Sequence, residues 1–136
     1  MFRLSNRSIE RLEGVNPVLV DIVSLAITKT KVDFGVSCGV RTLDTQKKLV
    51  ETGKSQTMRS YHLLQDDMTS WAVDLVAYID GDVCWEVNVY DDVADAIQAA
   101  SKEIDTKGFR VRWGGAWSVS DLAKWNKSME EAYLSY

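Results

Sequence analysis

The sequence predicts an α+β fold in which a small, mainly antiparallel sheet is flanked by helices. Apolar residues alternate with polar or small ones over 32–38 and 109–113, as in strands with one buried face. The apolar run 72–79 has the length of a further strand. Asp80-Gly81 follows it and is a two-residue hairpin signal that leads into a strand over 83–86.

Helix signals fill the rest of the N-terminal half. A short helix over 6–13 is predicted to end at Gly14, and a helix over 43–52 to end at Gly53. Between them, Asn16-Pro17 has the residue types of an N-cap and a first helical position. An apolar stripe at helical spacing follows, formed by Leu19, Ile22, Val23, Ala26 and Ile27.

Two more helices are predicted on either side of the strand at 109–113. The first has Asp91 and Asp92 beside its N-terminal dipole and an apolar face formed by Val93, Ile97, Ala100 and Ile104. The strand ends at Gly114-Gly115. Ser118 and Asp121 then resemble a capping box, which predicts one final helix with an apolar face formed by Leu122, Trp125, Met129 and Tyr133.

Length and composition predict a single domain over residues 1–136, expected to be a monomer. The formal net charge of -4 gives no electrostatic reason to expect nucleic acid or an anionic membrane as a partner. No apolar run has the length of a bilayer span or a signal peptide, so we expect a cytoplasmic protein. The two cysteines, Cys38 and Cys84, are expected to be buried small hydrophobic residues, with a chemical role as the less favoured alternative.

The two residues best suited to chemistry at a functional site are His62, the only histidine, and Asp74, a carboxylate inside an apolar strand. Imidazole and carboxylate are two of the side chains that bind a catalytic zinc, which usually takes three protein ligands and a water. Asp74 has a simpler explanation as well, since it could face water or form a salt bridge with Arg41 or Lys54. Residues 54–70, which carry His62, form a long polar loop, and loops of this length are often functional.

Two other features bear on function. Arg41 follows Gly39 at the end of a strand, where a guanidinium can clamp a carboxylate or polarise a carbonyl, although it could equally be a surface arginine. Trp113 is expected to pack in the core or to line a cleft beside Gly114-Gly115. The stretch 53–57 resembles a phosphate loop only superficially, because it lacks the first glycine of that motif.

Several stretches, in this order, resemble the VanY/D-alanyl-D-alanine carboxypeptidase family of zinc peptidases. The likeness is greatest to the small phage endolysins that cut the L-alanyl-D-glutamate bond of peptidoglycan. The matching stretches are 11–15, 33–36, 39–43, 53–57, 60–63, 72–78 and 112–115, together with Gln46. The resemblance implies the family's fold without its last strand.

The resemblance also implies roles for single residues. His62 and Asp74 would be two ligands of a catalytic Zn²⁺, and Arg41 would bind the substrate and stabilise the developing oxyanion. Ser60 would help to orient a ligand, and Gln46 and Trp113 would support the ligands or the substrate. The substrate would be a peptidoglycan stem peptide, which an enzyme made in the bacterial cytoplasm reaches only after release.

The chain departs from the family pattern in three places. Asp74 follows His62 by twelve positions (74 minus 62), five more than in the family motif, and the extra residues at about 64–68 bring Asp66 and Asp67 near the site. Ala116 stands where many relatives carry an aspartate. The family's last strand, with a His-x-Glu motif that supplies the third ligand and the general base, is missing, and Glu130 or Glu131 would have to substitute for it.

These departures leave two functions open. The first is a phage or prophage zinc peptidase that lyses the cell wall by cutting an L-alanyl-D-glutamate or D-Ala-D-Ala type bond, in a C-terminally truncated domain with an incomplete site. The alternative is an inactive homologue that binds wall peptide or a protein partner. A separate chain that supplies the missing histidine and glutamate is a third hypothesis.

Overall fold

The computed structural model describes all 136 residues and confirms the predicted α+β class. Its sheet has three antiparallel strands in the order β1-β2-β3, with β1 at Asp33–Cys38, β2 at Asp74–Ile79 and β3 at Asp82–Cys84. Gly81, with a φ of 84°, and Asp80, with a φ of 52°, form the predicted hairpin turn between β2 and β3.

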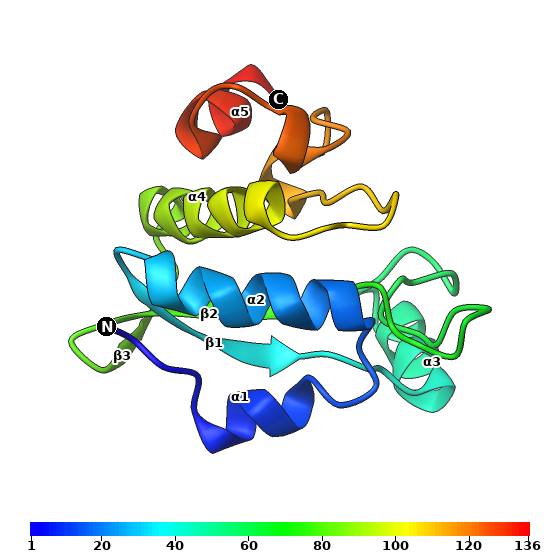
Figure 1. Cartoon of the computed structure of the whole chain (residues 1–136). Helices are drawn as coiled ribbons and strands as arrows, with labels where there is room; N and C mark the ends of the chain where they lie inside the picture. Colours follow the sequence, from blue (N-terminus) through cyan, green and yellow to red (C-terminus); the bar gives the residue numbers. More distant parts are fainter.

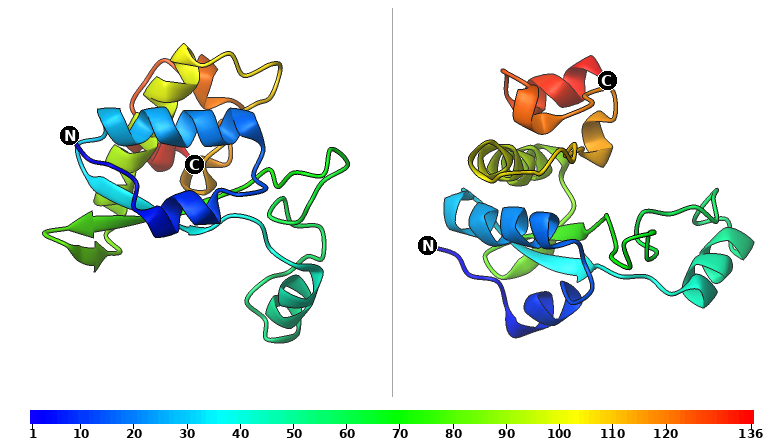
Figure 2. Two further views of the ribbon diagram at one scale, coloured as in Figure 1. Left: turned by 60° about the horizontal axis from the view of Figure 1, so that its bottom comes forward. Right: turned by 45° about the vertical axis from the view of Figure 1, so that its right-hand side comes forward.

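The helices lie in layers around this sheet. α2 (Pro17–Lys29) lies between the sheet and α4 (Val87–Glu103), and α5 (Met129–Ser135) covers the far side of α4 (Figure 1). α1 (Asn6–Arg11) lies beside β1. α3 (Leu43–Glu51) and the loop that follows it project from one end of the molecule, beyond the sheet (Figure 2). None of these helices has both the length and the apolar character needed to cross a bilayer.

Local capping explains why the N-terminal helices begin where the sequence predicts. The side chain of Asn16 accepts a hydrogen bond from the Val18 backbone N–H at 2.9 Å, and Pro17 occupies the first helical position of α2. Thr42 caps α3 in the same way through the Thr45 N–H. Gly14 and Gly53 both have φ values near +80°, which suits them to end the helices before them.

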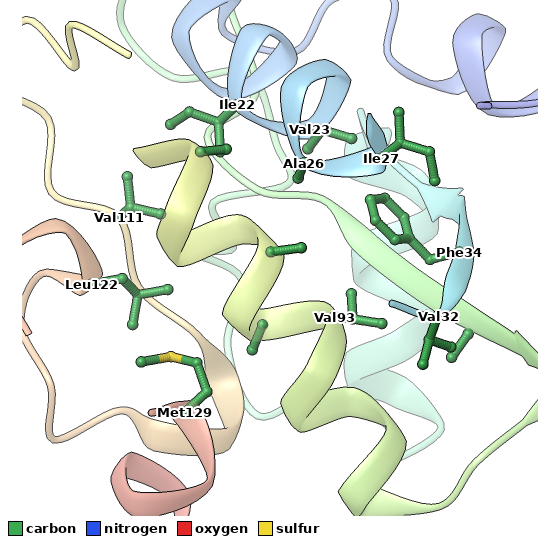
Figure 3. Packing of buried hydrophobic residues seen from close by; sticks show 14 of the residues in the cluster. Ile22, Val23, Ala26, Ile27, Val32, Phe34, Val93, Val111, Leu122 and Met129 are labelled. Carbon is green, nitrogen blue, oxygen red and sulfur yellow. The ribbon is translucent and has the colours of Figure 1, made fainter. Parts of the chain in front are cut away.

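One core of 21 buried residues joins the layers. Figure 3 shows side chains of α2, among them Ile22 and Val23, packed toward α4, with Leu122 and Met129 on the other side of that helix. Burial of this continuous apolar surface is the main force that holds the helices on the sheet.

Three predictions about the C-terminal half are wrong. α4 begins at Val87 instead of near Val93, so Asp91 and Asp92 lie inside the helix and its first turn holds no acidic residue. Residues 109–113 form no strand, because their backbone bonds elsewhere: Val111 accepts from the Leu122 N–H at 2.8 Å and donates to Asp121 Oδ1 at 3.3 Å. That segment therefore lies outside the sheet.

The predicted final helix is divided into a short 3₁₀ helix, η2 (Leu122–Lys124), and α5. Asp121 caps η2 with its own side chain, so it forms no capping box with Ser118, and Ser128 caps α5. Between the two helices, the side chain of Gln98 donates to the carbonyls of Trp125 and Lys127 at 2.8 and 3.2 Å. A continuous helix would have used these carbonyls internally, so this tertiary contact favours the break.

Candidate active site

His62, Asp74 and Arg41 converge at one end of the sheet, although they come from three separate segments. His62 Nε2 lies 3.3 Å from Asp74 Oδ1, and Arg41 Nη2 lies 3.7 Å from Asp74 Oδ2. About half of the Asp74 side chain is exposed, whereas that of His62 is mostly buried. Of the two salt bridges considered for Asp74, the one with Arg41 is present, and Lys54 forms no ion pair.

The end of the sheet positions Asp74. It is the first residue of β2 and pairs with Cys38, the last residue of β1, across an irregularity in register between Val36 and Cys38. Such irregularities re-aim side chains at the ends of strands. The carboxylate of Asp74 therefore reaches the loop residues that carry His62 and Arg41.

Hydrogen bonds to the backbone orient the His62 ring. Its Nδ1 lies 2.8 Å from the Gly39 carbonyl oxygen, which can only accept, so Nδ1 carries a proton and Nε2 is the nitrogen that faces Asp74. The Arg41 N–H donates to the His62 carbonyl at 2.8 Å, and the His62 N–H donates to Ser60 Oγ at 3.2 Å. Gly39 is needed here, because a Cβ at this position would collide with the Arg11 carbonyl oxygen.

Gln46 holds the guanidinium of Arg41. It is completely buried and accepts a hydrogen bond from Arg41 Nη1 at 2.8 Å. Its amide nitrogen donates to Ser55 Oγ at 2.9 Å and to the Thr57 carbonyl at 2.6 Å. The structure thus places Gln46 and Ser60, both predicted site residues, against Arg41 or His62.

The electrostatics of this cluster favour an ionised Asp74. The hydrogen bond from His62 is the main cause that lowers the pKa of the Asp74 carboxyl, and the positive charges of His62 and Arg41 lower it further. Partial burial works in the opposite direction but is outweighed. A carboxylate that is kept charged beside an imidazole is suited to bind a cation or to orient a proton donor.

Sequence reasoning did not select Cys38 as a site residue, and the expectation that it is a buried hydrophobic residue is wrong. Its thiol is half-buried, 3.9 Å from His62 Nδ1 and 4.0 Å from Arg41 Nη2. Ligand atoms of Cys38, His62 and Asp74 all lie within 4.8 Å of one another and form a group that could hold a metal ion. The sequence feature that could have identified Cys38 as a site residue is its position at the end of a predicted strand, three residues before Arg41.

The donor set suits a metal such as zinc. Two ligands bound tetrahedrally at about 2.0 Å lie roughly 3.3 Å apart, and the His62–Asp74 distance is 3.3 Å. The Gly39 carbonyl holds the other ring nitrogen, as outer partners of metal-bound histidines do. The Cys38 sulfur, within 4.8 Å of the other ligand atoms, would be the third donor of a set with an open fourth position.

A groove of about 720 Å³ opens beside His62 and Asp74. Most of its lining is apolar, and Trp113 is part of that lining, as one of the two predictions for this residue proposed. Tyr61, Trp71 and Phe109 form an aromatic wall, in which the ring centroids of Trp71 and Phe109 lie 5.2 Å apart. Neither Glu130 nor Glu131 lines this groove.

The additional loop residues are tied to the body of the protein through Asp67. Its carboxylate accepts hydrogen bonds from Trp71 Nε1 at 3.0 Å, from Asn16 Nδ2 at 3.3 Å and from Thr69 Oγ1 at 2.7 Å. Asp67 therefore connects the loop that carries His62 to the start of α2. Asp66 makes no side-chain hydrogen bond or ion pair. Of the two acidic residues that the longer loop was expected to bring near the site, only Asp67 therefore holds the loop in place.

Comparison with known proteins agrees with this fold. The family model described as phage L-alanyl-D-glutamate peptidase matches residues 1–132. The L-alanyl-D-glutamate peptidase of Escherichia phage T5 is 27% identical over 123 residues, which are 88% of this chain and 84% of that protein. The crystal structure of the Serratia marcescens L-Ala D-Glu endopeptidase ChiX matches with a TM-score of 0.73 and 41% identity, over 88% of this chain and 84% of that one.

The fold is that of a peptidase-type domain of the α+β class. The chain belongs to the phage L-alanyl-D-glutamate peptidase family. This confirms the family resemblance of the sequence, including its particular likeness to phage endolysins that act on peptidoglycan.

Proposed function

We propose that this chain is a metal-dependent peptidoglycan hydrolase that cleaves stem peptides at an L-alanyl-D-glutamate bond. The observation that carries this proposal is the convergence of His62, Asp74 and Arg41 beside a groove of about 720 Å³. Family membership supports the choice of substrate. His62, Asp74 and Cys38 would hold Zn²⁺, and thiolate and imidazole donors favour zinc over magnesium or calcium.

The protein's own residues would divide the work at this site. A zinc ion held there supplies Lewis acidity to the scissile carbonyl and to an attacking water. Arg41, held in place by Gln46, would orient the peptide carbonyl and stabilise the negative charge that develops on its oxygen. The Gly39 carbonyl and Ser60 would keep the His62 segment in position.

The second candidate function is a homologue that binds wall peptide without cutting it. The observation in its favour is the donor set, which contains one imidazole and no glutamate as general base. Glu130, considered above as a substitute, instead lies close enough to Asp91 to raise the pKa of that carboxyl. The groove and Arg41 would serve either function.

Metal content and peptide release test the proposal together. We expect about one zinc per wild-type chain by elemental analysis after dialysis, with a loss of at least about tenfold in zinc affinity for Asp74→Ala and Cys38→Ser. Asp21→Ala, which removes an exposed carboxylate on α2, is the matched control and should retain zinc.

New amino groups should appear when wild-type protein is incubated with purified peptidoglycan. Arg41→Ala should lower this rate by about a hundredfold or more, because it removes charge stabilisation in the transition state. Wild-type protein that holds zinc and binds peptidoglycan but releases no amino groups would contradict the hydrolase and favour the binding protein.

A further inference from the structure

The N-terminal half of β2 has a neighbouring strand on one side only. β1 pairs with β2 from Asp74 to Tyr78, whereas β3 pairs only with Ala77, Tyr78 and Ile79. After Cys84, the residue of β3 that pairs with Ala77, the chain leaves the sheet to form α4. The edge of β2 at Leu75 is therefore free on the side of β3.

The backbone groups of Leu75 point toward this free edge. Leu75 pairs with Val36 of β1, but Val36 uses its own backbone elsewhere: its N–H donates to Ser8 Oγ and its carbonyl accepts from Arg11 Nη1, both at 2.9 Å. Val36 and Leu75 are thus a non-hydrogen-bonded pair, in which the N–H and C=O of both residues point away from the partner strand.

Ala77, two residues after Leu75 in β2, has its backbone N–H at the same edge of the strand. The Ala77 N–H donates to the hydroxyl of Tyr90 at 3.2 Å, whereas the strand pairing leaves the backbone N–H and C=O of Leu75 without a partner in β1 or β3. Leu75 and Tyr90 both line the groove that also contains His62 and Asp74. A pair of unsatisfied backbone groups is a template for one more extended chain.

Charge indicates what kind of chain the groove accepts. Arg110 and Arg112 line the groove, and Asp74 is the only acidic residue in the lining. Arg112 stacks on the Trp117 ring with its guanidinium 3.8 Å from the ring centroid, and Arg110 forms no ion pair. In a protein with a net charge of -4, this local excess of arginine favours an anionic ligand.

We propose that the groove binds a short acidic peptide in extended conformation, which adds to the free edge of β2 by pairing with Leu75 and directs a carboxylate toward Arg110. The identity of the peptide as an L-alanyl-D-glutamate unit rests on the proposed function. Leu75 follows Asp74 directly in β2, so the peptide residue that pairs with Leu75 would lie close to Asp74. The pairing would therefore determine which bond of the peptide reaches His62 and Asp74.

The probe for this inference is N-acetyl-L-alanyl-D-glutamate, titrated by NMR into metal-free protein, which cannot cleave it by the proposed reaction. We expect amide hydrogen exchange at Leu75 to slow on binding. A probe with N-methyl-alanine should bind about tenfold more weakly, because it cannot donate to the Leu75 carbonyl.

Charge is tested with the uncharged diamide of the same probe. Arg110→Gln should weaken binding of the dianionic probe several-fold and leave the diamide unchanged, and the control Arg7→Gln, on α1, should change neither affinity.

The two proposals can fail separately. Equal affinity for the N-methylated probe, unchanged exchange at Leu75, or no binding of the probe would overturn the strand pairing, even if the protein cleaves peptidoglycan. Binding as described, without release of amino groups from peptidoglycan, would support the strand pairing and contradict only the hydrolase function.

Discussion

Asp91 is a carboxylate on α4 that is only 7% exposed and whose Oδ1 accepts no hydrogen bond. Burial is the main cause that raises its pKa, and the negative charges of Glu130, Asp95 and Asp92 raise it further. The folded protein therefore keeps the proton on Asp91 to a higher pH than the unfolded chain does. As pH rises above the unfolded pKa of about 3.9, the free energy of unfolding falls until the folded carboxyl has ionised.

Replacement of this carboxylate by an amide tests the sign of that effect. We expect Asp91→Asn to raise the free energy of unfolding relative to wild type at pH 7, and by clearly less at pH 4, because the amide cannot ionise. Urea denaturation at the two pH values measures the difference, with the exposed Asp82→Asn as control. A difference that is the same at both pH values would show that Asp91 is not the titrating group.

Residue types drew attention to His62 and Asp74, and the family resemblance gave these two residues and Arg41 their roles. Arg41, His62 and Asp74 could be selected because a lone histidine and a carboxylate in an apolar strand are unusual, and the family pattern gave them an order. Cys38 could not, because a cysteine in a strand is most often a small hydrophobic residue. Its proximity to His62 depends on how loop 54–70 folds back over the end of β1, which no local pattern records.

Elements with local signals were predicted well, and elements that depend on distant partners were not. The caps of α2 and α3 and the turn at Asp80-Gly81 lie within a few residues of the elements they define. The segment 109–113 alternates like a strand, yet its hydrogen bonds go to Asp121 and Leu122. Its partner was therefore decided by tertiary packing, which overrides local pattern.

The loop that carries His62 depends on one exposed carboxylate. We expect Asp67→Ala to speed amide exchange in residues 60–71 several-fold, because it removes the hydrogen bonds that join Asn16, Thr69 and Trp71. It should also weaken the zinc binding that we propose, since His62 would be less firmly held. Asp66→Ala is the matched control, because this neighbouring carboxylate makes no such contacts, and equal exchange in the two variants would refute the role of Asp67.

At the scale of the whole molecule, one core spans nearly the full chain, from Leu12 to Ala132. Met129 of α5 is fully buried in it, and its N–H donates to Asp95 Oδ1 of α4 at 2.8 Å. Residues 108–117, which form one wall of the groove, connect α4 to this C-terminal part. The groove is therefore bounded by parts of the chain that share a single core, and we expect them to unfold together.

Shortening the Met129 side chain tests whether the chain unfolds as one cooperative unit. Met129→Ala should lower the free energy of unfolding by about 2–5 kcal/mol, because it leaves a cavity between α4 and α5. If the chain is one cooperative domain, far-ultraviolet circular dichroism and tryptophan fluorescence should report the same shifted midpoint in urea, since Trp71 lies just before β2 and Trp125 just after η2. Leu134→Ala, on the exposed face of the same helix, should change stability by less than about 0.5 kcal/mol. Two separate transitions in Met129→Ala would instead mean that the C-terminal part folds as its own unit and that one wall of the groove can move independently of the site.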